Sequence, residues 1–134
     1  MPDLPSTYRL YPDQPDDFEA RIRILTPEEG GRKLPTYNGI RWNFLYATAN
    51  NNKHYFPIYP DIYYPETGNS WWEKSPLPVN EWLFARMYNI ESEQGSGVHQ
   101  KLMRLGTTFY GCEGSRIIAE GTVTRITGLF EERQ

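Results

Sequence analysis

The sequence predicts a mostly β domain, and three observations support this fold class. Aromatic residues make up 15% of the 134 residues, and these side chains favour half-buried strands over helices. In several segments apolar residues alternate with polar ones, which is the period of a strand with one buried face. All eleven prolines lie at or before Pro78, so the second part of the chain can carry longer uninterrupted elements.

Length and composition predict one cytosolic domain. We expect the folded domain over residues 18–128, an extended arm or lead-in strand over 1–17, and a tail over 129–134. The single Cys112 excludes an intramolecular disulfide, and no apolar run approaches the roughly 18 residues of a membrane span. We therefore expect neither secretion nor a membrane partner.

The first predicted strand covers Phe18–Ile24, where the alternation is cleanest. A turn follows at 27–31, and a second strand is predicted over 40–47 because four apolar residues again alternate there. The Asn-rich stretch 47–53 predicts a hairpin connection, with a short returning strand over 54–58.

The middle of the chain gives weaker patterns. Residues 59–78 form the least regular region. Residues 79–90 fit either a strand or an amphipathic helix, and their aromatic content favours the strand. Residues 91–99 contain two glycines and predict a flexible loop.

The last part of the chain predicts a hairpin. Its first strand runs over 106–112, its turn is Glu113-Gly114, and its second strand covers 115–127. Ile117 and Ile118 are both apolar and Gly121 interrupts the pattern, which predicts a β-bulge near 119–121.

Two segments near the ends of the domain carry motifs at a fixed spacing. Residues 18–44 contain a strand, a Glu-Gly-Gly-Arg turn at 29–32 and a second strand with Arg41. Residues 109–128 contain a Glu-Gly-Ser-Arg hairpin at 113–116 followed by a closing strand. Both segments resemble, without gaps and in the same order, the C-terminal β-barrel domain of elongation factor Tu.

This resemblance implies an all-β fold, a small closed antiparallel β-barrel of about six strands, and a function in binding. In that family the barrel contacts aminoacyl-tRNA, the GTPase domain and the nucleotide-exchange factor. The GTPase domain has no counterpart here, because the chain lacks the Gly-rich phosphate loop and residues 52–55 lack the Asp of the guanine-reading motif. We expect no nucleotide and no other cofactor.

The resemblance also implies a set of RNA- or partner-binding positions. Three departures weaken it, since Cys112 replaces an Arg, Ser115 replaces a Gly, and Asn43 replaces a Gln. A structural alternative is that the glycines serve turns and that Arg32 or Arg116 pairs with a nearby Glu. The positions carried over are Glu29, Gly30, Gly31, Arg32, Arg41, Asn43, Glu113, Gly114 and Arg116.

A second candidate set lies in the proline-rich region, which has no counterpart in the family. Exposed Tyr and Trp residues dominate the energetic centres of protein interfaces, and they can also stack on bases. The alternative is that they cap one end of the barrel as a minor core. The candidate residues are Tyr63, Tyr64, Trp71 and Trp72.

Catalytic and metal signals are weak. His54 and His99 lie far apart without further ligands at metal spacing, and Cys112 has no His nearby in the sequence. We therefore expect a non-enzymatic binding module that holds no metal. Its expected partner is a protein connected with translation or with elongation factor Tu; the alternative is weak tRNA binding. The net charge of −3 favours protein over RNA.

Overall fold

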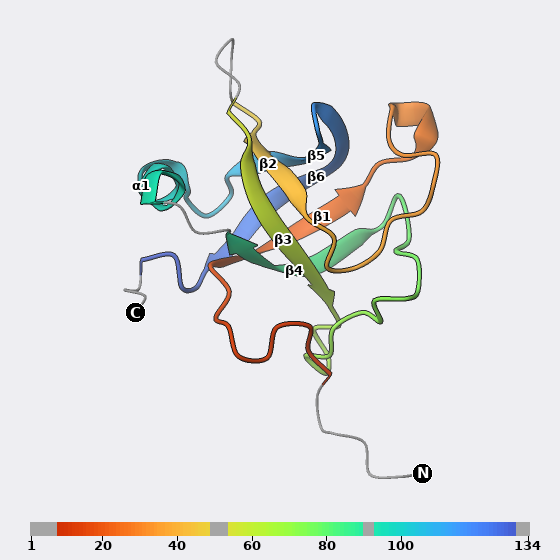
Figure 1. Cartoon of the computed structure of the whole chain (residues 1–134), viewed down its shortest axis with the longest axis horizontal. Coiled ribbons are helices and arrows are strands. Elements are labelled where there is room, and N and C mark those ends of the chain that lie inside the picture. Colours follow the sequence, from red (N-terminus) through yellow and green to blue (C-terminus); the bar gives the residue numbers. More distant parts are fainter. Residues whose placement is uncertain (1–7, 49–53, 90–92, 131–134) are drawn as a thin grey trace.

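Six antiparallel strands close into a barrel in the computed structural model, which describes residues 8–48, 54–89 and 93–130 (Figure 1). Around the barrel the order is β1-β4-β3-β2-β5-β6, and β6 pairs with β1. The all-β prediction is confirmed. The elements are β1 (Phe18–Ile24), the 3-10 helix η1 (Pro27–Glu29), β2 (Trp42–Tyr46), β3 (Phe56–Tyr63), β4 (Trp82–Asn89), α1 (Glu93–Leu102), β5 (Thr108–Glu113) and β6 (Arg116–Ile126).

Aromatic side chains fill the barrel interior. The ring of Phe44 stacks on that of Phe109 with 4.6 Å between centroids, and Phe18 meets both rings edge-on. All three rings are almost completely buried. The apolar residues that alternate along β1 therefore face this core. Each large ring buries on the order of 150–250 Å² of surface there.

Two glycines make room for these rings. A Cβ atom on Gly111 would lie 2.5 Å from the Trp42 ring, and one on Gly121 would lie 2.4 Å from the Phe109 ring. Real Cβ atoms do not approach other carbons this closely, so β5 and β6 can pass the aromatic core only with glycine at these positions.

The β-bulge occurs slightly earlier in β6 than predicted. Gly111 pairs with Ala119 while Cys112 pairs with Ile117, so Ile118 is the extra residue on β6. This shift explains the two successive apolar side chains, since the bulge lets Ile118 enter the core. A second shift lies farther along β6, where it pairs with β1.

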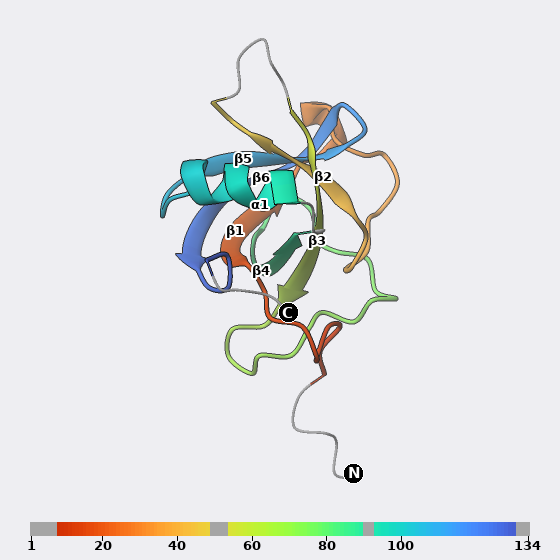
Figure 2. The same cartoon turned by 60° about the vertical axis from the view of Figure 1, so that its left-hand side comes forward.

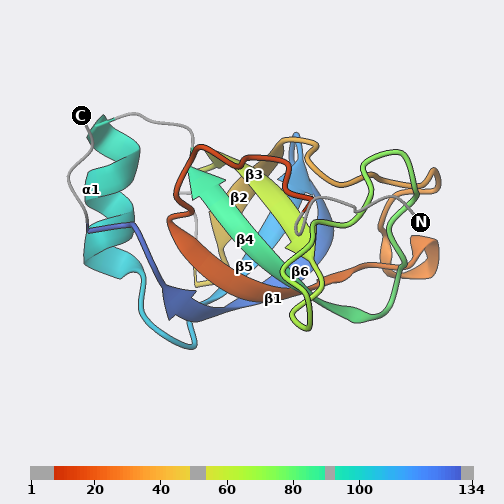
Figure 3. The same ribbon diagram turned by 90° about the horizontal axis from the view of Figure 1, so that it is seen from below.

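The flexible loop predicted for residues 91–99 is wrong from residue 93 onward, because this segment forms α1. Figures 2 and 3 show α1 lying across one end of the barrel. His99 and Met103 are buried there, and Val98 packs against the core. Glycine lowers helix propensity by about 1 kcal/mol relative to alanine, so this helix depends on packing against the barrel.

The other strand predictions are confirmed in outline. The segment 79–90 contains the strand β4, as predicted. The region 59–78 is more regular than predicted, because β3 continues through Tyr63. The middle of the predicted 47–53 connection lies outside the described residues, as do 1–7 and 131–134. No helix among the described residues has the length and apolar character needed to cross a membrane.

His99 is the polar group at the centre of the α1 contact. Its side chain is 1% exposed and lies among the rings of Phe44, Tyr46 and Phe56. Its Nδ1 shares a 2.6 Å hydrogen bond with the Tyr46 hydroxyl. Burial lowers the pKa of His99 to about 4, so the neutral imidazole is the form that fits this end of the barrel.

We expect the free energy of unfolding to fall as the pH drops. Because the folded pKa of His99 lies below its unfolded value, the stabilisation is complete above about pH 6.5 and is lost progressively toward pH 4. Between pH 7 and 5 the loss is about 2 kcal/mol. Urea unfolding at both pH values measures it: His99→Gln should flatten the profile, whereas His54→Gln, at an exposed position, should leave it unchanged.

Gly111→Ala is expected to lower stability by about 1–3 kcal/mol, because the new methyl group overlaps the Trp42 ring. The matched control is Ser115→Ala on the exposed hairpin tip, which should stay within about 0.5 kcal/mol. Urea midpoints compare the variants. Equal stability of both would contradict the close approach of β5 to Trp42.

Candidate binding site at the loop end of the barrel

The end of the barrel opposite α1 is formed by connecting segments (Figure 3). The segment 25–41 and the segment 64–81 lie side by side there. The amide of Leu77 donates to the carbonyl of Thr36 at 2.9 Å, and Tyr37 pairs with Pro76 as an isolated β-bridge. The β5–β6 hairpin turn completes this end. The fold thus brings both predicted sets of site residues to one end of the barrel.

Glu29 is held by its own turn. Its carboxylate accepts hydrogen bonds from Arg23 at 2.8 Å and from the Thr26 amide at 2.9 Å. The Arg23 guanidinium and Thr26 together lower the pKa of Glu29 to about 2. Gly30 ends the 3-10 helix with a φ of 93°, a conformation that favours glycine. These contacts give Glu29 and Gly30 a structural reason to be present.

The two Gly-containing turns touch through an ion pair. Arg32 pairs with Glu113, and the Asn43 amide donates to the carbonyl of Gly114 at 3.4 Å. Arg32 therefore follows the predicted structural alternative, with Glu113 as its partner. Arg41 and Arg116 are exposed. Neither guanidinium group has a hydrogen bond or ion pair among the residues that the structure describes.

A Cβ atom on Gly31 would lie 2.6 Å from the carbonyl oxygen of Leu25, so the backbone itself requires glycine at this position. Gly114 adopts a φ of 57° in the hairpin turn. The glycines of the predicted binding set are thereby accounted for by turn geometry.

The aromatic candidates divide into wall and loop positions. Tyr63 ends β3, donates to Glu19 at 2.5 Å, and has the Arg86 guanidinium over its ring. Tyr64 stacks on Trp71 with 5.4 Å between centroids. Trp71 packs against the core and donates from Nε1 to the carbonyl of Ser75. The capping interpretation therefore describes Trp71.

Trp72 is different, because half of its side chain is exposed. Its ring meets the ring of Tyr8 at 5.4 Å, a contact with the N-terminal segment. Tyr64 is exposed to 42%. Trp72 and Tyr64 are thus the members of the aromatic set that a partner can reach.

A buried polar cluster fixes the loops beneath Trp72. The Asp61 carboxylate is completely buried and accepts hydrogen bonds from Asn38 at 3.2 Å and Ser70 at 3.0 Å. Arg86 lies 3.6 Å from the same carboxylate. Burial raises the pKa of Asp61, and these partners oppose the rise. No local sequence pattern indicates this cluster, because its members come from separate segments.

Residues 8–11 of the N-terminal segment, which we call the strap, pack over the cluster. The Tyr8 carbonyl accepts from the Ser70 amide at 2.7 Å, and the Leu10 amide donates to the Ser70 hydroxyl at 3.2 Å. The Tyr11 ring packs edge-on against Tyr88, and its hydroxyl donates to the Gly39 carbonyl at 3.3 Å. Part of the predicted arm is therefore ordered against the barrel.

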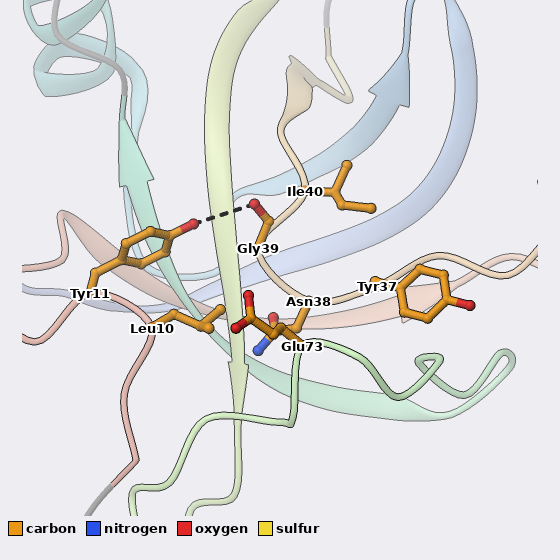
Figure 4. Close-up of a pocket in the computed structure, with 7 residues that line it drawn as sticks. All are labelled: Leu10, Tyr11, Tyr37, Asn38, Gly39, Ile40 and Glu73. Carbon is orange, nitrogen blue, oxygen red and sulfur yellow. Dashed lines mark hydrogen bonds between the residues drawn. The ribbon is translucent and has the colours of Figure 1, made fainter.

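A cleft of about 460 Å³ opens between the strap and the two loops (Figure 4). Its walls are mainly apolar and aromatic, and Glu73 is the charged residue in its lining. Sequence analysis missed this site, since its parts lie far apart in the chain. The lining residues are Leu10, Tyr11, Tyr37, Asn38, Gly39, Ile40 and Glu73.

A smaller hollow of about 300 Å³ lies on the barrel wall beside Arg21 and Trp82. Among the described residues, no three His, Cys, Asp or Glu side chains gather closely enough to hold a metal ion. A comparison with protein-family models finds no match, and a comparison with curated protein sequences finds none either. The elongation factor Tu relationship stays a prediction.

Asp61→Ala is expected to destabilise the protein by about 3–5 kcal/mol, because it leaves the Arg86 charge buried without its carboxylate. Glu66→Ala removes an exposed carboxylate from the same end and should change stability by less than about 0.5 kcal/mol. Urea unfolding at pH 7 compares the two. A loss near zero for Asp61→Ala would contradict the anchoring role of the cluster.

Proposed function

We propose that this chain is a non-enzymatic binding module whose partner is a protein, bound at the loop end through Trp72 and the adjoining cleft. The observation that carries the proposal is the position of Trp72. It is half exposed and directly precedes Glu73 of the cleft lining. A large aromatic side chain beside a concave, mainly apolar surface is the usual energetic centre of a protein interface.

The surroundings of Trp72 support a protein partner. Ile40 on the cleft rim is 39% exposed, and Leu34 on the same segment is 71% exposed. The loops that carry these residues are fixed by the Asp61 cluster and by the Tyr37–Pro76 bridge. A surface that is ordered before binding loses less conformational entropy when the partner docks.

The contacts of the turn arginines count against the RNA alternative. Phosphate recognition depends on cations that are available to the backbone, and Arg32 is already paired with Glu113. Arg41 and Arg116 alone stay unpaired among the described arginines of the predicted set. The net charge of −3 adds a repulsion. A protein connected with translation or with elongation factor Tu is the partner that the sequence resemblance suggests.

The placement of the nucleophilic and basic candidates supports a non-enzymatic role. The Cys112 side chain is 1% exposed in β5, and His99 is buried beneath α1. Neither side chain reaches the cleft lining. A nucleophile and its base must both meet the substrate, and these two residues lie inside the core.

Trp72→Ala is expected to weaken partner binding by about 2 kcal/mol, because it removes the exposed ring at the proposed centre of the interface. The matched control is Trp82→Ala, since Trp82 is 46% exposed on the barrel wall. The partner is captured with the wild-type chain, identified by mass spectrometry, purified and titrated against all three proteins. Equal losses for both variants would contradict the proposed surface.

Gel shifts with bulk tRNA at low and high salt test the alternative in parallel. If binding falls with salt and Arg41→Ala weakens it while Trp72→Ala does not, the module is an RNA binder and the proposal is wrong. If no shift occurs at low salt, the protein interpretation stands on the titration alone.

A further inference from the structure

We propose that the cleft receives an arginine or lysine side chain flanked by apolar residues, presented by a segment of the partner protein, with Glu73 pairing to the cation. The inference rests on the proposed function and names the chemistry of its ligand. It follows from which groups in the cleft are already satisfied and which stay available.

The carboxylate of Glu73 is the available charge. Glu73 is exposed at the mouth of the cleft, and no cation pairs with it among the described residues. Lys74 and Arg41 directly follow lining residues in the sequence, but neither lines the cleft. The Tyr8 hydroxyl lies near Glu73, so an arriving ammonium or guanidinium group meets a carboxylate that has a phenol beside it and no paired cation.

Two other polar side chains of the cleft, Asn38 and Tyr11, are already used. The Asn38 amide donates to the carbonyls of Ile62 and Trp71, and its oxygen accepts from the Ile62 amide at 2.6 Å. The Tyr11 hydroxyl donates to Gly39. An anionic ligand would need free hydrogen-bond donors, and the donors of Asn38 and Tyr11 are already engaged. A cation needs acceptors, which Glu73 provides.

The nearby carboxylates also give the cleft a negative electrostatic potential. Burial raises the pKa of Tyr11 to about 12, and the charges of Asp61 and Glu73 add to the rise. A negative potential therefore reaches the Tyr11 hydroxyl at the wall of the cleft. The negative charges of Asp61 and Glu73 favour a bound cation at the same place, whereas burial, the largest cause of the shift, disfavours any charged group.

The walls suit the stem of a long cationic side chain. Leu10 and Ile40 present aliphatic groups, while Tyr11 and Tyr37 contribute rings. Figure 4 shows these side chains coming from three separate segments of the chain. Lysine and arginine bury their methylene groups against apolar surface and keep the charge at the polar end. Trp72 directly precedes Glu73 in the chain and is half exposed, so its ring is available to an apolar flanking residue.

Three short peptides test this inference on the whole chain. They are acetyl-Gly-Leu-Arg-Leu-Gly-amide and the same peptide with Gln or Glu in place of Arg, each titrated into the ¹⁵N-labelled protein and followed by amide chemical shifts. The Arg peptide should shift the amides of Leu10, Tyr11, Gly39 and Ile40. It should bind about three- to fivefold more tightly than the Gln peptide, which is the strength of an exposed ion pair.

Glu73→Gln should bring the affinity for the Arg peptide down to that for the Gln peptide. Glu66→Gln is the matched control, since Glu66 is an exposed carboxylate outside the cleft lining, and it should leave all three affinities unchanged. Since Glu73 is exposed, Glu73→Gln should preserve the overall amide spectrum, which reports an intact fold.

Equal binding of the Arg and Glu peptides would overturn the inference, and so would shifts confined to other residues. No shift at about 10 mM peptide, a concentration at which even a weak contact is visible, would overturn it too. The purified partner separates it from the proposed function. If Trp72→Ala weakens partner binding and Glu73→Gln does not, the protein-binding proposal stands and the cation pocket is wrong. If neither variant weakens it, both are wrong.

Discussion

The structure depends on closing a narrow barrel around an aromatic core. The Phe44 and Phe109 rings stack at its centre, and the close passage of β5 and β6 is possible only because Gly111 and Gly121 lack side chains. A closed sheet leaves no free edge for strand pairing. Every connection therefore emerges at one of two ends, and the chemistry available to a partner is decided by what covers each end.

The two ends are covered by different kinds of interaction. At one end α1 inserts the neutral His99 into the aromatic core and Met103 follows directly after the helix, so the closure is mainly apolar, with a hydrogen bond shared between His99 and Tyr46. Toward the other end, loops pack over the buried Asp61–Arg86 pair on the outer face of β3 and β4. Hydrogen bonds to a buried carboxylate are directional, so this second closure fixes loop positions as well as excluding water.

The sequence predicted the elements that have a local pattern. β1 is predictable because a period of two is visible within seven residues. β4 has no clean period of two, and its aromatic content is the signal that predicts a strand. α1 was missed because its glycines indicate a loop and only the barrel end stabilises it. The second half of β3 was missed because Pro60 suggests a break, yet β2 pairs with β3 only as far as Ile58, so Pro60 removes no hydrogen bond on that side.

The same reasoning separates the two predicted sets of site residues. The glycines of the turns are explained by positive φ angles and close backbone approach, and Arg32 and Glu113 pair with each other, whereas Arg116 has no side-chain partner among the described residues. Their spacing therefore reports how the barrel end is built, whether or not a ligand binds there. The cleft has no local sequence pattern, because Leu10, Gly39 and Glu73 meet only after folding. It is assembled from the strap, the proline-rich loop and residues 37–40; the first two lie outside the family resemblance, and residues 37–40 lie within it. If the cleft binds a partner as proposed, its specificity depends on all three segments, and the barrel supplies the rigid support that places them.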